Sequence, residues 1–158
     1  MEYFDYYLLH ALDEGAAKQA EEWGAFDFML EKKAKGLVKH VGFSFHDKAE
    51  VLDKILTRHP EMEYVQLQLN YADWEDSEVQ SRKCYEVCVK YGKPVLVMDL
   101  KGGMLANVPA EAEALLKGAR PEMSVASWAI RFAASQENVF MVLSGMSDEQ
   151  QVRIIFPI

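Results

Sequence analysis

The chain of 158 residues is 50% hydrophobic and 27% charged, with 9 Gly and 5 Pro, a globular composition that excludes a fibrous or linker protein. Its 17 Lys and Arg against 25 Asp and Glu give a formal net charge of −8, which disfavours nucleic acid and anionic membranes as partners, since both attract a basic surface. Two cysteines are too few for a disulfide framework, and without a signal-like N-terminus or an apolar run of about 18 residues we expect a cytoplasmic protein with no membrane span.

Five short apolar runs of strand length follow one another along the chain. Each is rich in Val, Leu, Phe and Tyr, the residues that favour strands. The runs cover residues 3–10, 40–45, 64–70, 94–100 and 139–144. No segment rich in Pro, Gly or Ser separates them, so we expect residues 1–158 to form a single domain.

The stretches between these runs have helical periodicity. They cover residues 16–35, 47–58, 77–91 and 124–135. Gly36 stands where a helix C-cap is expected. Asp47 and Glu50 have the spacing of a capping box at the start of the second helix, and the last two segments each begin at a serine.

This alternation of strands and helices indicates an α/β fold, because parallel strands need crossover helices. Two layouts remain open, a doubly wound open sheet and part of a closed (β/α) barrel. Both place chemistry just past the carboxyl ends of the strands. Polar residues lie at these ends: His10 and Asn70 end two of the runs, Ser44 is the next-to-last residue of another, and Ser147 follows the fifth.

The third run has one wholly polar face, because Gln66, Gln68 and Asn70 alternate with apolar residues. In a sheet covered on both faces, each buried amide without a partner would cost about 1–3 kcal/mol. In a barrel this face points into the lumen, towards a ligand. A structural hydrogen-bond network among the amides is the alternative interpretation for Gln68.

The motif search is largely negative. The sequence contains neither a G-x-G-x-x-G fingerprint nor a P-loop, and the Lys101-Gly102-Gly103 turn is a weak signal by itself. Cys84 and Cys88 lack further ligands at metal-site spacing, so we expect buried free thiols and no metal site.

Two groups of polar residues are candidates for a site or for solvent contact. The carboxylates of Asp73, Glu75 and Asp76 surround a tryptophan, and we interpret them as a solvated loop. Among the four histidines, His10 and His46 lie at strand exits and are the candidates for chemistry, with a surface position as the alternative for His46.

Several segments together resemble the aldo-keto reductases. Residues 4–10 (FDYYLLH) and 36–44 (GLVKHVGFS) resemble the middle strands of that family, and residues 66–70 (QLQLN) resemble its sixth strand. Ser144-Gly145-Met146-Ser147 resembles the turn after its eighth strand. The segment GFSFHDKAEVLDKIL is similar to the bacterial branch of ferredoxin-linked predicted oxidoreductases. The resemblance to the family runs from about residue 3 to residue 152.

The resemblance implies an NAD(P)H-dependent reductase of small carbonyl compounds on a (β/α)8 barrel. It also implies that this chain corresponds to the C-terminal part, the fourth to eighth strands. The family's catalytic aspartate, tyrosine and lysine belong to the first three strands, so we expect a truncated form that is inactive alone. An alternative of another class is a half-barrel module, without catalysis of its own, that self-associates through its exposed sheet edges or pairs with another chain.

The family's site residues carry over position by position. His10 matches the histidine that orients the carbonyl. Ser44 and Gln66 match the residues that hold the nicotinamide carboxamide, and Met98 stands where many members stack a tyrosine on the nicotinamide ring. The expected contacts with the rest of the NADP(H) or NAD(H) molecule are Lys101, Gly145, Ser147 and Gln151. No cysteine-rich cluster motif is present, so no iron–sulfur centre is expected.

Overall fold

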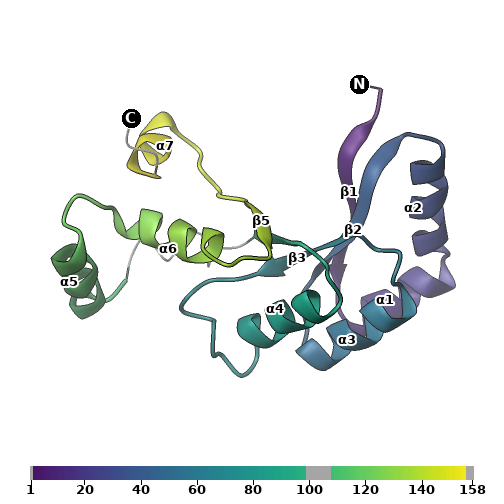
Figure 1. Cartoon of the computed structure of the whole chain (residues 1–158), viewed down its shortest axis with the longest axis horizontal. Coiled ribbons are helices and arrows are strands. Elements are labelled where there is room, and N and C mark those ends of the chain that lie inside the picture. Colours follow the sequence, from purple (N-terminus) through teal and green to yellow (C-terminus); the bar gives the residue numbers. More distant parts are fainter. Residues whose placement is uncertain (1, 99–107, 156–158) are drawn as a thin grey trace.

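The structure is a computed structural model that describes residues 2–98 and 108–155, with the side chains of residues 154 and 155 excepted. Five parallel strands form one sheet in the order β1-β2-β3-β4-β5 (Figure 1). The strands are β1 (Phe4–Leu12), β2 (Val38–Phe45), β3 (Tyr64–Gln68), β4 (Val95–Met98) and β5 (Val139–Val142). The predicted α/β class, the parallel pairing and all five strands are therefore confirmed.

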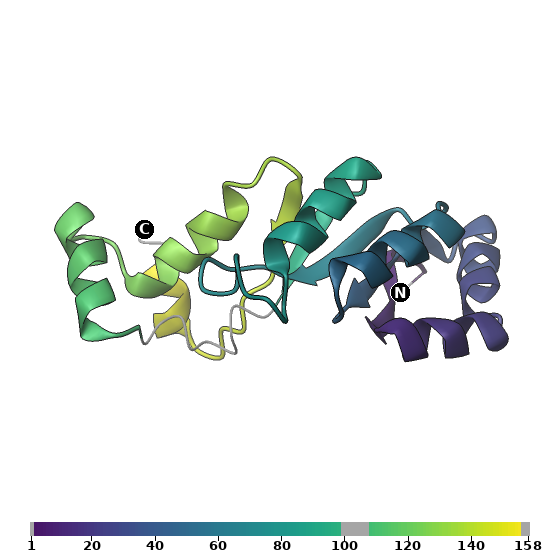
Figure 2. The same ribbon diagram turned by 90° about the horizontal axis from the view of Figure 1, so that it is seen from below.

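Seven helices connect or follow these strands in the described ranges. They are α1 (Glu14–Glu22), α2 (Ala25–Ala34), α3 (Ala49–Arg58), α4 (Ser81–Lys90), α5 (Ala110–Ala119), α6 (Val125–Ala134) and α7 (Glu149–Ile155). Helices α1, α3 and α4 lie along the same side of the sheet in both views (Figures 1 and 2). Their apolar faces, with those of α2 and α6, pack on one face of the strands and enclose the core.

Alternation along the strands divides the sheet into two unlike faces. Val41, Phe43 and Val65 belong to the face under the helices and are fully buried. The opposite face carries Tyr6 of β1, whose ring lies 5.3 Å from that of Tyr64 on β3 and 5.5 Å from that of Phe140 on β5. Rings from the two edge strands thus meet across this face. The sheet is therefore curved, as half of a barrel is, and we call this side the concave face.

A glycine on β2 makes room for one of these rings. Gly42 pairs with Tyr64 in the parallel ladder. A Cβ atom at position 42 would lie 2.4 Å from the Tyr64 carbonyl oxygen and 2.7 Å from its Cδ1. The aromatic ring therefore lies directly over the bare backbone of residue 42, and a larger side chain there has no space.

The first predicted helix is two helices. Residues 16–35 divide between α1 and α2, because Gly24 adopts a left-handed conformation with φ of 67°. Gly36, with φ of 72°, ends α2 as expected: its N–H donates to Lys33 and the next N–H donates to Lys32. Treating residues 16–35 as one helix was wrong because glycine at position 24 permits a turn that the apolar pattern does not report.

Two predicted helix starts were also wrong. Asp47 does not cap α3, which begins after Lys48. Its carboxylate accepts instead from the backbone N–H of Glu14 at 3.0 Å, at the start of α1, and from that of Lys48 at 2.7 Å. The helix expected from residue 77 begins at Ser81, while Ser124 caps α6 as predicted, accepting from the Ser127 N–H at 3.1 Å.

The outer elements are less embedded than the first four strands and helices. Helix α5 buries none of its residues, and its main packing partner is α6. The strand β1 leaves its first residues exposed along one edge of the sheet. None of the helices in the described ranges is both long and apolar enough to cross a membrane.

Candidate functional site

The carboxyl ends of β2, β3 and β4 bring three predicted site residues together on the concave face, namely Ser44, Gln66 and Met98. Ser44 pairs with Gln66 in the ladder between β2 and β3. Gln68 pairs with Met98 in the next ladder. Because the strands are parallel and adjacent, their last inward-facing side chains form one polar rim.

Gln66 and Met98 are in direct contact within this rim. The amide Nε2 of Gln66 donates to the Met98 sulfur at 2.8 Å. Both side chains are half-buried. This contact uses the amide nitrogen of Gln66, so its Oε1 is the atom that remains to accept a hydrogen bond.

Ser44 has a different environment from the one expected of a ligand contact. It is fully buried, and its Oγ accepts from the backbone N–H of Ala11 at 2.6 Å. Ala11 has φ of 55° and lies in an irregularity where the pairing of β1 with β2 shifts register. The hydroxyl of Ser44 thereby holds the end of β1, directly after the exposed side chain of His10.

Gln68 belongs to a buried polar network. Asp73 is 1% exposed, and its Oδ2 accepts from Gln68 Nε2 and from Asn70 Nδ2, each at 2.7 Å. Asn70 Oδ1 in turn accepts from the backbone N–H groups of Ala72 and Asp73. The interpretation of Asp73 as part of a solvated loop was wrong, although Glu75 and Asp76 are exposed as predicted.

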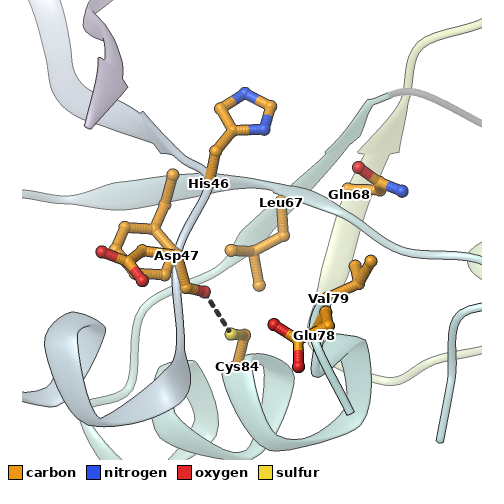
Figure 3. A pocket seen from close by; sticks show the side chains of 8 residues that line it. His46, Asp47, Leu67, Gln68, Glu78, Val79 and Cys84 are labelled. Atoms are coloured by element: carbon orange, nitrogen blue, oxygen red, sulfur yellow. Dashed lines mark hydrogen bonds between the residues drawn. The ribbon is translucent and has the colours of Figure 1, made fainter. Parts of the chain in front are cut away.

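A pocket of about 210 Å³ opens where β2 and β3 end above α4. Figure 3 shows Leu67 pointing towards α4, whereas the amide of Gln68 and the ring of His46 point away from Cys84. The Cys84 thiol donates to the Asp47 carbonyl at 3.7 Å, and burial raises its pKa to about 12. A thiol with such a pKa stays protonated near neutral pH and is a packing group rather than a nucleophile.

The two cysteines are buried and free, as predicted. Burial also raises the pKa of Cys88. Across the described ranges, no group of three or more His, Cys, Asp or Glu side chains is arranged to hold a metal ion.

The predicted contacts for the far end of the cofactor lie beyond β5. Gly145 is exposed, with nothing within 4 Å of the position of an added Cβ. The Ser147 N–H donates to Gln151 Oε1 at 2.7 Å, and the Gln151 N–H donates to Asp148 Oδ1 at 2.8 Å. Ser147 and Asp148 directly precede α7, Gln151 lies in its first turn, and α7 packs on α6. Lys101 lies outside the described residues.

Two tyrosines near the sheet have raised pKa values. Burial, with smaller effects from Tyr6 and Glu63, raises the pKa of Tyr64 to about 12, and burial raises that of Tyr71. Neither hydroxyl has a hydrogen-bond partner among the described residues. Tyr64 begins β3, at the opposite end of the strand from Gln68, so it does not share the rim.

Comparison with known proteins identifies the fold independently. The model of the Aldo/keto reductase family matches residues 1–156. An aldo/keto reductase from Klebsiella pneumoniae, solved with NADP and acetate, is 18% identical with a TM-score of 0.64, and the match covers 98% of this chain and 53% of that one. An aldo-keto reductase from Bacillus halodurans is 17% identical with a TM-score of 0.68, and the match covers 98% of this chain and 53% of that one. An aldo/keto reductase from Brucella melitensis is 20% identical with a TM-score of 0.65, and the match covers 100% of this chain and 57% of that one.

At these identities the solved structures show a common fold, five parallel strands that match about half of a (β/α)8 barrel. The chain spans about half the length of these proteins. No curated protein matches the chain.

Proposed function

The chain belongs to the aldo/keto reductase family, and from this premise we propose that it forms the nicotinamide-binding side of an NAD(P)H-dependent oxidoreductase acting on small carbonyl compounds. The relative from Klebsiella pneumoniae contains NADP. In this chain the observation that carries the proposal is the polar rim at the end of β3, where Gln66 and Gln68 each use their amide nitrogen within the protein.

The atoms left over on this rim suit a carboxamide. Gln66 and Gln68 keep their Oε1 atoms as acceptors, and a nicotinamide carboxamide carries two N–H donors. Ser44 accepts from Ala11 through its oxygen, which leaves its hydroxyl proton to donate to the carboxamide oxygen. The donor and acceptor set therefore fits the group that the family binds.

The remaining predicted residues have compatible positions in this proposal. Met98 offers an apolar side chain next to Gln66, where the nicotinamide ring would lie. Gly145, Ser147 and Gln151 would contact the phosphate and adenosine end. Lys101 is proposed, on the resemblance alone, to contact the pyrophosphate.

The chemistry that a bound reduced nicotinamide supplies is hydride transfer to a carbonyl carbon. The exposed imidazole of His10, at the carboxyl end of β1, would orient the carbonyl oxygen by donating a hydrogen bond to it. A proton donor must reach the same oxygen. Tyr64 is unsuitable, because it is buried at the other end of β3 with a pKa of about 12. We therefore propose that the chain alone binds the cofactor without reducing a carbonyl compound.

Binding is tested by titrating NADPH and NADH, to millimolar concentration, into the protein while following its tryptophan fluorescence. We expect saturable binding that weakens about tenfold in Gln66→Leu, which removes an amide hydrogen bond and its partner contact. Gln19→Leu, an exposed change on α1, is the matched control and should leave the affinity unaltered. Absence of binding by the unmodified chain refutes the proposal, and NADPH oxidation with an aldehyde refutes the part that concerns inactivity.

A second candidate function, self-association, is supported by the exposed edge of β1. Tyr3, Phe4, Tyr6 and Tyr7 are 39–51% exposed on or beside a strand of nine residues. The charge of Asp5 on this edge is offset by Lys39 at 2.7 Å. A long, apolar and nearly neutral edge is suited to antiparallel pairing with the same strand of a second copy.

Sedimentation equilibrium at micromolar concentration tests this candidate. The chain and the control Val89→Lys, a change of an exposed residue on α4, should be dimers, and Tyr7→Lys should be a monomer. A monomeric unmodified chain rules the candidate out.

A further inference from the structure

We propose that Asp73 is a positioning residue that fixes the direction of the Gln68 amide, so that Gln68 presents an oxygen to one N–H of the nicotinamide carboxamide. The proposal rests on the proposed function, because it concerns the same rim. It explains why the Gln68 amide presents its oxygen to the ligand, and it gives a role to a buried carboxylate that the resemblance does not assign.

The carboxylate of Asp73 is built into the protein rather than placed on its surface. It is 1% exposed, and its Oδ2 accepts from Gln68 and Asn70 at 2.7 Å. Asn70 is itself completely buried and is oriented by two backbone N–H groups, which donate to its Oδ1. Because Asn70 Oδ1 is occupied by donors, its nitrogen is the end that must face Asp73.

The same reasoning determines the direction of Gln68. An amide has a donating end and an accepting end, and a carboxylate oxygen that already receives the Asn70 N–H can only accept. Turning the Gln68 amide would place its Oε1 at hydrogen-bond distance from Asp73 Oδ2, where two acceptors repel each other. Asp73 therefore holds Nε2 towards itself and leaves Oε1 as the free end.

The position of Gln68 in β3 directs that free end to the rim. Gln68 is the last residue of β3, two residues after Gln66 and hence on the same face, and it pairs with Met98. Figure 3 shows its amide pointing away from Cys84 and the helix layer. No hydrogen bond from a described residue reaches Oε1. Two glutamine oxygens on one face of β3 thus match the two N–H groups of a primary carboxamide.

The consequence is selectivity for a donor at this position. A ligand that offers an N–H to Gln68 gains a hydrogen bond, and a ligand with a carbonyl or methyl group at the same place does not. With Ala at position 73 no acceptor holds the Gln68 nitrogen, so either end of the Gln68 amide can face the ligand and the selectivity is lost.

The test compares NAD⁺ with 3-acetylpyridine adenine dinucleotide, in which a methyl group replaces the carboxamide NH₂. Dissociation constants for both are measured by calorimetry with the unmodified chain, Asp73→Ala, Gln68→Met and Glu75→Ala. Glu75 is the matched control, because it is a carboxylate of the same loop that pairs with Arg82 and is 68% exposed. Circular dichroism establishes that each variant is folded.

We expect the unmodified chain and Glu75→Ala to prefer NAD⁺, and the preference to fall roughly threefold to tenfold in Asp73→Ala and Gln68→Met, as for the loss of one hydrogen bond. A purely structural role for Asp73 would weaken both dinucleotides equally and leave the ratio unchanged, which overturns the proposal. If Asp73→Ala does not fold, the ratio in Gln68→Met decides. An unmodified chain that binds neither dinucleotide overturns the proposed function as well, whereas binding with unchanged ratios overturns this inference alone.

Discussion

The substitution Gly42→Ala should destabilise the sheet strongly for so small a change. The new Cβ would lie 2.4 Å from the Tyr64 carbonyl oxygen, 2.7 Å from its Cδ1 and 2.8 Å from its Cε1. The carbon–oxygen distance is well inside van der Waals contact, and that oxygen belongs to the backbone of β3. Relief therefore requires β2 and β3 to separate or the ring to leave its place over residue 42.

Overpacking of this kind costs about 1–3 kcal/mol, and we expect the upper part of that range because a backbone atom must move. Urea unfolding followed by circular dichroism measures the free energy of unfolding. The matched control is Gly118→Ala in α5, where nothing lies within 4 Å of the new Cβ. The control should gain up to about 1 kcal/mol, because alanine favours helix over glycine.

The double variant Gly42→Ala with Tyr64→Leu separates the two contacts. Leucine removes the ring clash but leaves the carbonyl clash, so the alanine should cost less in the leucine background than in the native chain, without becoming neutral. A Gly42→Ala protein as stable as the unmodified chain would refute the reasoning, since it would mean that the ring does not lie over residue 42.

Three further predictions concern charges and a helix start. Burial alone would raise the pKa of Glu63, but Lys33 and a backbone N–H hold this pKa below its ordinary 4.5 in the folded protein. The ionised carboxylate should therefore stabilise the fold above pH 4.5, and this stability should be lost as the pH falls through the lowered pKa of the folded state. Urea unfolding curves between pH 3 and 6 should show that the free energy of unfolding falls by about 1 kcal/mol less on acidification in Glu63→Gln than in the unmodified chain. Burial raises the pKa of Cys84 from 9.0 to about 12, so stability should fall as the pH rises above 9, and urea curves at pH 8 and about pH 10 should differ less in Cys84→Ala. Asp47→Ala should cost about 1 kcal/mol by removing the acceptor for the Glu14 N–H, and an unchanged melting temperature would contradict this role.

The sheet could be predicted from the sequence because its signals are local. Alternation at residues 64–68 identified both the strand and its polar face, and the cap at Ser124 lies within four residues of the N–H that it accepts. Helix starts that depend on tertiary contacts could not be predicted. Asp47 has the spacing of a cap for its own helix, but its carboxylate is drawn to Glu14, which is distant in sequence.

The candidate site was predictable to the same extent. The common face of Gln66 and Gln68 follows from the period of a strand. The burial of Asp73 depends on the loop after β3 turning back onto that strand. In the sequence the neighbouring carboxylates instead predict a solvated loop, so the burial could not be predicted. The contact between Ser44 and Ala11 joins residues 33 apart through an irregularity in β1, which no pattern of residue types reports.

The sparse packing of α5 has a consequence for the motions of the chain. A helix of ten residues that buries no side chain gains little from tertiary contacts, and a helix of this length is marginal in water by itself. Its amide protons should therefore exchange with solvent through local opening, at a free energy well below that of global unfolding. Added protease should cut first within residues 110–119 and leave the segment from β1 to β4 intact.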